Sequence, residues 1–526
     1  MGQIEALIFL LGVAALLAQL ARVVNVPYPI FLVLGGLGLG FVPGLPAVEI
    51  PPEVIFVVFL PPLLNSAAFF SSPLDLRAHL RAITLLAVGL VFVTTFAVAT
   101  VAHYAVGLPW AASFVLGAIL APTDPVAAEA IFRRLGVPER VGTVVGGESL
   151  INDGTGLAAF RVALIAVTAG TFSLWDAGLN LLLVGGGGVV VGLVLTWTIL
   201  PLWGRLRDPS IQITFSVLIP YGVYILAEEI LHVSGILAVV TYGLFQGWRA
   251  PRLFADASTR IQAISFWGVL IFVLEALLFV LIGQQLPPIV ENLGEYGAWQ
   301  LVLYATLVYA VVVGTRTAFF FTIPYLHPVF DRIFRSRYLR GTWQEYLVMS
   351  WSGMRGGVSL AAALTVPAFV DRRAFAARDL ILFITFSVIL ATLVLQGLTL
   401  PSLIKALRLE GEEDRLAELR ARLKGTRVAL GRLEQICTEN GLPPETEQGM
   451  RDYYEDRIQR YEDGIEAGGV TEEYAASSAA WRNWRRDLIE AEREAIIQMR
   501  DGGEISPETM RRIERDLDLE ESRIGG

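Results

Sequence analysis

The chain has 526 residues, of which 54% are hydrophobic and only 17% are charged, against about 25% charged residues in an ordinary soluble domain. Its one cysteine, Cys437, excludes an intrachain disulfide scaffold and a cysteine-based zinc site. The formal net charge of -9 makes no basic surface for a nucleic acid, so we expect no nucleic-acid partner. This composition favours a protein that crosses a membrane several times.

The charged residues divide the chain into two predicted domains. Residues 1–410 hold 22 acidic and 23 basic residues, whereas the much shorter stretch 411–526 holds 28 acidic and 18 basic residues. We therefore expect a transmembrane domain over residues 1–410 and a helical cytoplasmic tail over residues 411–526. The tail is expected to be regulatory or dimerising, and a merely solvated domain is the alternative.

Thirteen apolar stretches in residues 1–410 approach or reach the length that spans a bilayer as a helix. They lie near residues 3–20, 28–43, 53–70, 82–106, 110–132, 143–168, 178–202, 211–229, 233–247, 263–283, 299–323, 345–368 and 380–404. The stretches are continuous rather than alternating, which excludes a membrane β-barrel. The expected fold is an all-α polytopic membrane protein with about 13 transmembrane helices.

Arginine placement predicts the orientation of these helices. Fifteen arginines lie in the first loop and in every second loop after it, and three lie in the alternate loops: Arg372, Arg373 and Arg378. Basic loops stay on the cytoplasmic side. We therefore expect the N-terminus outside and the tail in the cytoplasm, in the plasma (inner) membrane of a bacterium. The first stretch lacks a basic region before it, so it is expected to be a helix rather than a cleaved signal.

The fifth stretch carries an acid between two prolines, in Ala121-Pro-Thr-Asp-Pro125. Each proline removes a hydrogen-bond donor and clashes with the preceding turn, so we expect the helix to break here. A break frees carbonyl groups and points half-helix ends at the membrane midplane, where transporters hold ions. Thr123 and Asp124 are therefore candidate ion ligands, and a plain proline kink is the alternative.

The sixth stretch carries Gly146-Gly-Glu-Ser-Leu-Ile-Asn-Asp-Gly154. Residues four apart share a helix face, so Ser149 lies over Asp153 and Glu148 lies over Asn152. Carboxylate, hydroxyl and amide oxygens suit Na⁺ or Li⁺, and a charge inside a span is a functional candidate by default. Because burial favours the neutral form of a carboxyl group, Asp153 is expected to exchange a proton for a cation.

The twelfth stretch places Arg355 among three glycines, in Ser350-Trp-Ser-Gly-Met-Arg-Gly-Gly-Val-Ser359. Glycine weakens a helix, which predicts unwinding or very close packing here. A buried arginine needs an anion, and Glu148 is the expected partner in a structural ion pair. Stretches five and twelve hold matching places in two six-helix halves, which predicts inverted repeats whose crossed, broken helices form the binding site.

Other charges within the apolar stretches remain without a defined role. Arg316 lies deep in the eleventh stretch. Glu275, Arg161 and Glu229 are possible site residues, and Glu229 is more simply explained as a side chain near a helix end.

Taken together, three motifs resemble the sodium/proton antiporters of the monovalent cation:proton antiporter-1 family, which includes NhaP-type exchangers and animal sodium/proton exchangers. The motifs are Thr123-Asp-Pro125, Glu148-Ser with Asn152-Asp153, and Met354-Arg-Gly-Gly357. The segments His232 to Ala238 and Glu275 to Gly283 are also similar to the family, and the resemblance covers roughly residues 5–405.

The resemblance implies a homodimer in membrane lipid, with a dimer domain, a moving core domain and no cofactor besides the transported Na⁺ and H⁺. It implies that Asp153 binds the ion and the proton (the metal ligands for Na⁺ being Asp153 and Asp124), that Thr123 and Ser149 assist, and that Glu148 and Arg355 form the stabilising pair. Asn152 is the pattern of electroneutral members. We therefore expect an antiporter rather than an enzyme. A K⁺/H⁺ antiporter and a tail-gated cation channel are the alternatives.

Overall fold

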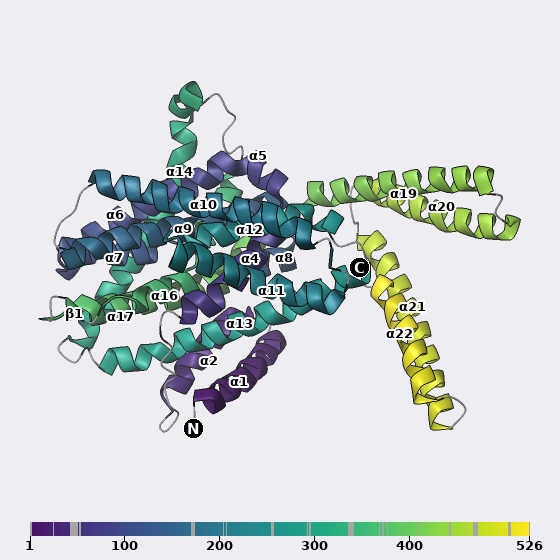
Figure 1. The fold of residues 1–526 in the computed structure, drawn as a ribbon, viewed down its shortest axis with the longest axis horizontal. Coiled ribbons are helices and arrows are strands. Elements are labelled where there is room, and N and C mark those ends of the chain that lie inside the picture. The colour runs from purple at the N-terminus through teal and green to yellow at the C-terminus, as the bar shows by residue number, and fades with distance from the viewer. Residues whose placement is uncertain are drawn as a thin grey trace. The chain divides into compact units, whose positions relative to one another are not determined.

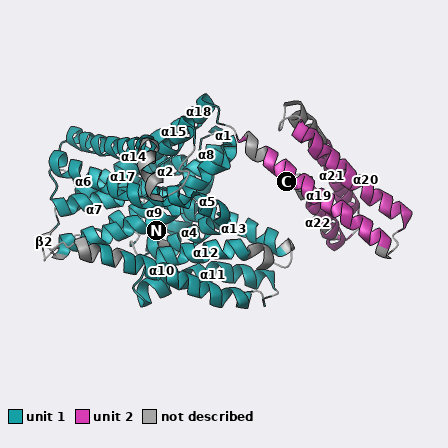
Figure 2. Cartoon of the chain, turned by 90° about the horizontal axis from the view of Figure 1, so that it is seen from above, with its two compact units in different colours: residues 1–410 teal, residues 411–526 magenta. Residues whose placement is uncertain are grey.

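The apolar stretches of residues 1–410 form helices in the part of the chain that the structure describes. This structure is a computed structural model, and it describes residues 3–524 except 25, 43–50, 52–53, 170–173, 204, 207, 254–256, 292, 294–295, 335–340, 368, 371–372, 376, 410, 441–442, 467–471 and 503–505. The chain divides into two compact units, residues 1–410 and 411–526 (Figure 2).

The first unit is built from helices, several of which contain a π-helical turn, and from one very short β-hairpin (Figure 1). In chain order these elements are α1 (Gln3–Val24), α2 (Tyr28–Gly40), η1 (Ile55–Phe59), α4 (Leu60–Phe70), α5 (Pro73–Thr84), η2 (Leu85–Leu90), α6 (Val91–Val101), η3 (Ala102–Val106), α7 (Trp110–Leu120), α8 (Val126–Leu135), α9 (Glu139–Ala169), α10 (Leu174–Trp203), α11 (Pro209–Ile225), η4 (Leu226–Ile230), α12 (Gly235–Leu253), α13 (Ala257–Glu291), α14 (Ala298–Phe334), α15 (Trp343–Trp351), α16 (Gly357–Leu364), β1 (Phe369–Val370), β2 (Arg373–Ala374), α17 (Ala377–Ala391), η5 (Thr392–Gln396) and α18 (Gly397–Leu407).

Among the described residues, 8 helices are long and apolar enough to cross a membrane. They are Leu7–Val24, Pro73–Val106, Glu139–Thr168, Leu182–Trp203, Pro209–Ile230, Thr259–Pro287, Ala298–Thr322 and Ala377–Leu407. Shorter apolar helices cover Tyr28–Gly40, Ile55–Phe70 and Trp110–Leu120. The prediction of an all-helical, multi-pass membrane domain is confirmed, whereas 13 crossings in inverted repeats stay a prediction. Of the three arginines expected outside, Arg372 lies outside the described residues.

Both predicted helix breaks are present. α7 ends at Leu120 and α8 begins at Val126, and the residues between them, which include the two prolines, are not helical. α15 ends at Trp351 and α16 begins at Gly357 after the glycine-containing segment. Proline and clustered glycine thus interrupt the backbone where the sequence predicts it.

The most extensive helix packing occurs within two groups of helices, α1, α2, α4 and α10 to α13 in one, and α5 to α9 and α14 to α18 in the other. Glycines let helices approach closely in the first group. A Cβ on Gly36 of α2 would overlap the backbone of Val280 on α13, and one on Gly283 would overlap Val33. Small residues such as these allow two helix backbones to approach closely.

In its described residues, the second unit forms four helices, α19 (Glu412–Asn440), α20 (Pro444–Glu466), α21 (Glu472–Asp501) and α22 (Pro507–Ile524). α19 packs against α20 and α21 packs against α22. Charged side chains stabilise the second pair, because Arg493 of α21 contacts Asp518 and Glu521 of α22 at 2.8 and 2.9 Å. The glycines Gly441 and Gly468, which predict breaks in the tail, lie outside the described residues.

Candidate ion-binding site at two crossed helix breaks

The two broken helices meet at their breaks. The N–H of Asp124, between α7 and α8, donates a hydrogen bond of 2.8 Å to the carbonyl of Met354, between α15 and α16. The approach depends on Gly356, since a Cβ at that position would overlap the Asp124 carboxylate. The crossing therefore brings two half-helix N-termini, those of α8 and α16, next to one acid.

Two charged side chains complement the freed helix ends. The Val126 N–H, at the start of α8, donates to the Asp124 carboxylate at 3.0 Å, and a negative group is favoured beside a helix N-terminus. Arg355 supplies a positive charge to carbonyl groups near the breaks. Its Nε donates to the carbonyl of Leu120 at the end of α7, at 3.1 Å, and its Nη1 donates to the carbonyl of Gly353. Each charge at the crossing is thus offset mainly by backbone groups that the breaks leave unpaired.

Glu148 pairs with Arg316, and the prediction that it pairs with Arg355 is wrong. Arg316 on α14 holds both oxygens of Glu148 on α9, with Nη1–Oε1 at 2.5 Å and Nη2–Oε2 at 2.8 Å, and both side chains are 1% exposed. The physical reason is that the guanidinium of Arg355 is already used by the carbonyls of Leu120 and Gly353. Gly353 also leaves room for Arg316, whose side chain a Cβ there would overlap.

Three polar side chains near the first break form a connected network. Ser149 Oγ donates to the carbonyl of Thr123 at 2.7 Å, and Asn152 Nδ2 donates to Thr123 Oγ1 at 2.9 Å. Thr123 Oγ1 in turn lies 3.5 Å from Glu148 Oε1. This network ties α9 to the break between α7 and α8, and it leaves Asn152 Oδ1 buried without a partner among the described residues.

Asp153 differs from the other buried acids. Its side chain is 6% exposed, and no hydrogen bond or ion pair to its carboxylate is found within the described ranges. It lines a cavity of about 90 Å³ together with Asp124, Thr123 and Ser149. Of the other acids here, Glu148 pairs with a guanidinium, Asp124 lies at helix N-termini, and Glu129, which also lines the cavity, pairs with Arg133, so Asp153 is the candidate to bind a cation or a proton.

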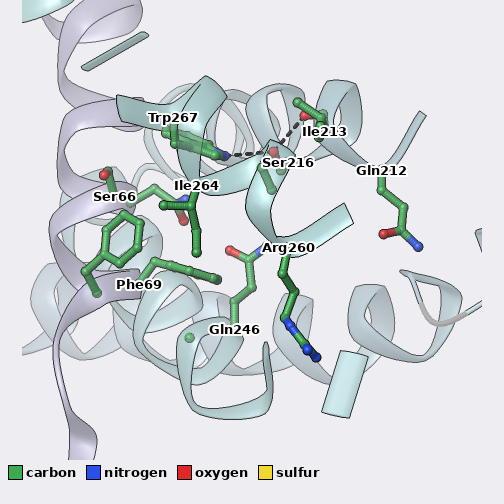
Figure 3. A pocket seen from close by; sticks show the side chains of 13 residues that line it. Ser66, Phe69, Gln212, Ile213, Ser216, Gln246, Arg260, Ile264 and Trp267 are labelled. Carbon is green, nitrogen blue, oxygen red and sulfur yellow. Dashed lines mark hydrogen bonds between the residues drawn. The ribbon is translucent and has the colours of Figure 1, made fainter. Parts of the chain in front are cut away.

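A second cavity, of about 340 Å³ between α4, α11, α12 and α13, lacks this chemistry (Figure 3). Its lining includes Gln246, Arg260 and Trp267 but no carboxylate, and Trp267 donates to Ser216 at 2.9 Å. A site that exchanges H⁺ for a metal cation needs an acid that can bind either one. The smaller cavity, rather than the larger, is therefore the candidate ion site.

None of the three possible site residues makes a hydrogen bond or ion pair to Asp124 or Asp153 within the described ranges. Glu275 on α13 is buried and accepts a hydrogen bond from the hydroxyl of Tyr28 of α2. Sequence reasoning missed Tyr28, because nothing in its position just after a proline indicates a contact with a buried acid. Arg161 pairs with Glu228. Glu229 is exposed.

Comparison with known proteins identifies the family of this chain. The family model described as "Sodium/hydrogen exchanger, transmembrane" matches residues 8–406. The chain is 35% identical to the Na⁺/H⁺ antiporter ApNhaP of Aphanothece halophytica, covering 82% of this chain and 79% of that protein. It is 32% identical to an uncharacterized Na⁺/H⁺ exchanger of Mycobacterium tuberculosis, over 99% of this chain and 97% of the relative.

The fold agrees as well. The sodium proton antiporter MjNhaP1 of Methanocaldococcus jannaschii superposes with a TM-score of 0.60 at 22% identity, over 77% of this chain and 98% of that one. The resemblance read from the three motifs is confirmed. The chain belongs to the transmembrane sodium/hydrogen exchanger family, as an antiporter of the NhaP type.

Proposed function

We propose that this protein exchanges one Na⁺ or Li⁺ for one H⁺ at Asp153, by alternating access and without a cofactor. Membership of the exchanger family supports cation/proton exchange as the activity. The single observation that carries the finer proposal is the uncompensated, buried carboxylate of Asp153 in the small cavity at the crossed breaks.

The proposed cycle uses one site with two competing occupants. A cation would take oxygens from Asp153 and Asp124, with Thr123, Ser149 and Asn152 holding the surrounding geometry. Moving an unneutralised carboxylate through the low-dielectric interior is costly, so the site crosses only with H⁺ or the cation bound. Exchange then follows from competition, with no other energy source than the two gradients.

The charges at the crossing support an electroneutral stoichiometry. Glu148 is fully paired with Arg316, and Asn152, next to Asp153, cannot carry a second charge. With the Asp124 carboxylate held by the Val126 N–H at the start of α8, the proposal is that the Asp153 charge alone is exchanged, for one H⁺ or one monovalent cation in each half-cycle.

The proposed setting is a plasma membrane, with the N-terminus outside, the tail of residues 411–526 in the cytoplasm and two copies forming a dimer. The arginine distribution supports the orientation. The separate compact unit formed by residues 411–526 supports a distinct, regulatory role for the tail.

Proteoliposomes test the proposal. Na⁺-driven pH change is expected to disappear in Asp153→Asn and to persist in a matched acid-to-amide control, Asp208→Asn. Asp208 caps α11 through the Ile211 N–H at 3.1 Å, and asparagine caps helices equally well. Exchange that persists in well-folded Asp153→Asn would refute the assignment of Asp153 as the ion-binding carboxylate.

The same liposomes separate the alternatives. A series with Li⁺, Na⁺ and K⁺ tells a Na⁺ antiporter from a K⁺/H⁺ antiporter. Unitary currents with no coupled proton movement would instead identify a cation channel. A membrane potential should neither drive nor slow a one-for-one exchange, so a strong voltage dependence would contradict electroneutrality.

A further inference from the structure

Two helices of the two packing groups are joined by an ion pair beyond the ion site. Arg161 of α9 pairs through Nη2 with Glu228 Oε1 in η4, the π-helical end of α11. Arg161 lies eight residues after Asp153 on a continuous helix, which places it about 12 Å further along the axis. The pair thus connects the helix that carries the candidate site to a helix of the other group.

The carboxylate of Glu228 is held in place for this contact. Its second oxygen, Oε2, accepts a hydrogen bond of 2.8 Å from the N–H of Gly235, the first residue of α12. The turn before it is fixed by the N–H of Val233, which donates to Ala227, and by that of Ser234, which donates to Val184 of α10, at 2.8 and 3.0 Å. Glu228 is therefore a preorganised acceptor for the Arg161 guanidinium.

The ion pair lies on the closed side of Asp153. On α9, the residues that line the small cavity run from Gly146 to Asp153. The next residue, Gly154, packs directly against Leu237 of α12, because a Cβ there would come within 2.9 Å of that side chain. The α9 residues that line the cavity thus lie toward the Gly146 end, and just past Asp153, toward Arg161, α9 contacts α12 at Leu237.

We infer that Arg161 and Glu228 form a latch that holds this side of Asp153 closed and must open in each exchange cycle. The inference rests on the proposed alternating access at Asp153, which requires α9 and α12 to separate at Leu237. The Arg161 side chain is 46% exposed and that of Glu228 15%. An ion pair this exposed shifts the equilibrium between the closed and open forms of the contact by no more than about fivefold. That is enough to favour the closed form and small enough for the pair to break in every cycle.

Cysteine accessibility tests the latch in the full-length protein. Cys437→Ser removes the native thiol, and Leu237→Cys places a reporter at the sealed contact. A membrane-impermeant maleimide is added from the side opposite the tail. Arg161→Gln and Glu228→Gln are each expected to raise the labelling rate about two- to fivefold, whereas Arg161→Lys, which keeps a cation for Glu228, should leave it near the starting value.

The matched control is Arg140→Gln, which removes a charge from the other end of the same helix, where Arg140 lies 3.8 Å from Glu345. An equal rise in Arg140→Gln, or no rise in either latch variant, would overturn the inference. Reversal of the pair, Arg161→Glu with Glu228→Arg, should restore slow labelling, and failure to do so would argue for a merely structural effect.

Two outcomes distinguish a failure of the latch from a failure of the proposed function. If exchange is lost in Asp153→Asn but the labelling rate is unchanged in Arg161→Gln and Glu228→Gln, the latch alone is refuted. Exchange that persists in Asp153→Asn refutes the proposed function. If Leu237→Cys lowers the yield of folded protein, deuterium exchange in the first turn of α12 supplies the same comparison: it should rise in the single variants and fall again in the reversed pair.

Discussion

Removing one partner of the Glu148–Arg316 pair should leave a buried charge without compensation. Both side chains are 1% exposed and share two contacts, at 2.5 and 2.8 Å. Breaking a buried ion pair from one side costs about 3–5 kcal/mol. Arg316→Met and Glu148→Gln are therefore each expected to lower the free energy of unfolding by about that amount.

The coupling energy between Glu148→Gln and Arg316→Met, measured in the double variant, tests the pairing most directly. With both charges gone, no unpaired ion remains, so the combined loss should be smaller than the sum of the two single losses by about 2–3 kcal/mol. Arg355 provides the comparison, because its guanidinium serves the carbonyls of Leu120 and Gly353. The coupling between Glu148→Gln and Arg355→Met should be smaller by at least about 1 kcal/mol.

The assay is unfolding of the purified protein in detergent, by SDS titration for free energies and by heating for midpoint temperatures. Six proteins suffice for both cycles: the parent, Glu148→Gln, Arg316→Met, Arg355→Met and the two doubles. A stronger coupling of Glu148 to Arg355 than to Arg316 would refute the assignment of the pair. Equal stability of Arg316→Met and the parent would refute the argument from burial.

Two further predictions concern other contacts. Gly356→Ala puts a Cβ onto the Asp124 carboxylate and should reduce exchange in proteoliposomes at least about tenfold, whereas Gly314→Ala in α14, where a Cβ meets open space, should leave the rate unchanged; full activity of Gly356→Ala would mean that the crossing tolerates a wider separation. Arg493→Ala removes contacts to Asp518 and Glu521, so limited trypsin digestion should cut within α21 and α22 severalfold faster, while α19 and α20 are digested as before; an unchanged digestion pattern would show that apolar packing alone holds this hairpin.

Much of the ion site follows from sequence because its physical causes are local. Two prolines around Asp124 interrupt a helix wherever it packs, and three glycines around Arg355 weaken another. A deep carboxylate such as Asp153 is costly in any transmembrane helix, so it can be recognised as functional from its position alone. The candidate site and its approximate place could therefore be proposed without tertiary information.

Pairing was decided only by the tertiary structure. Glu148 had two buried arginines as possible partners, Arg316 and Arg355, with the same chemistry, and sequence distance cannot rank them. The choice depends on how α14 packs against the crossing and on the carbonyls of Leu120 and Gly353, which occupy Arg355. Similarly, Arg161 forms its ion pair with Glu228 rather than with the adjacent Glu229, a choice that sequence position cannot make.

The sequence by itself determined that the chain crosses a membrane, where two of its helices break and which acid lies deep in the bundle. These are consequences of apolar length, proline and glycine chemistry and the cost of a buried charge, all of which act within one helix. Only the tertiary structure decided which charges are neutralised and where α9 contacts α12 next to Asp153. Both depend on contacts between helices far apart in the chain, where an ion pair or a sealed face exists only once the helices have packed.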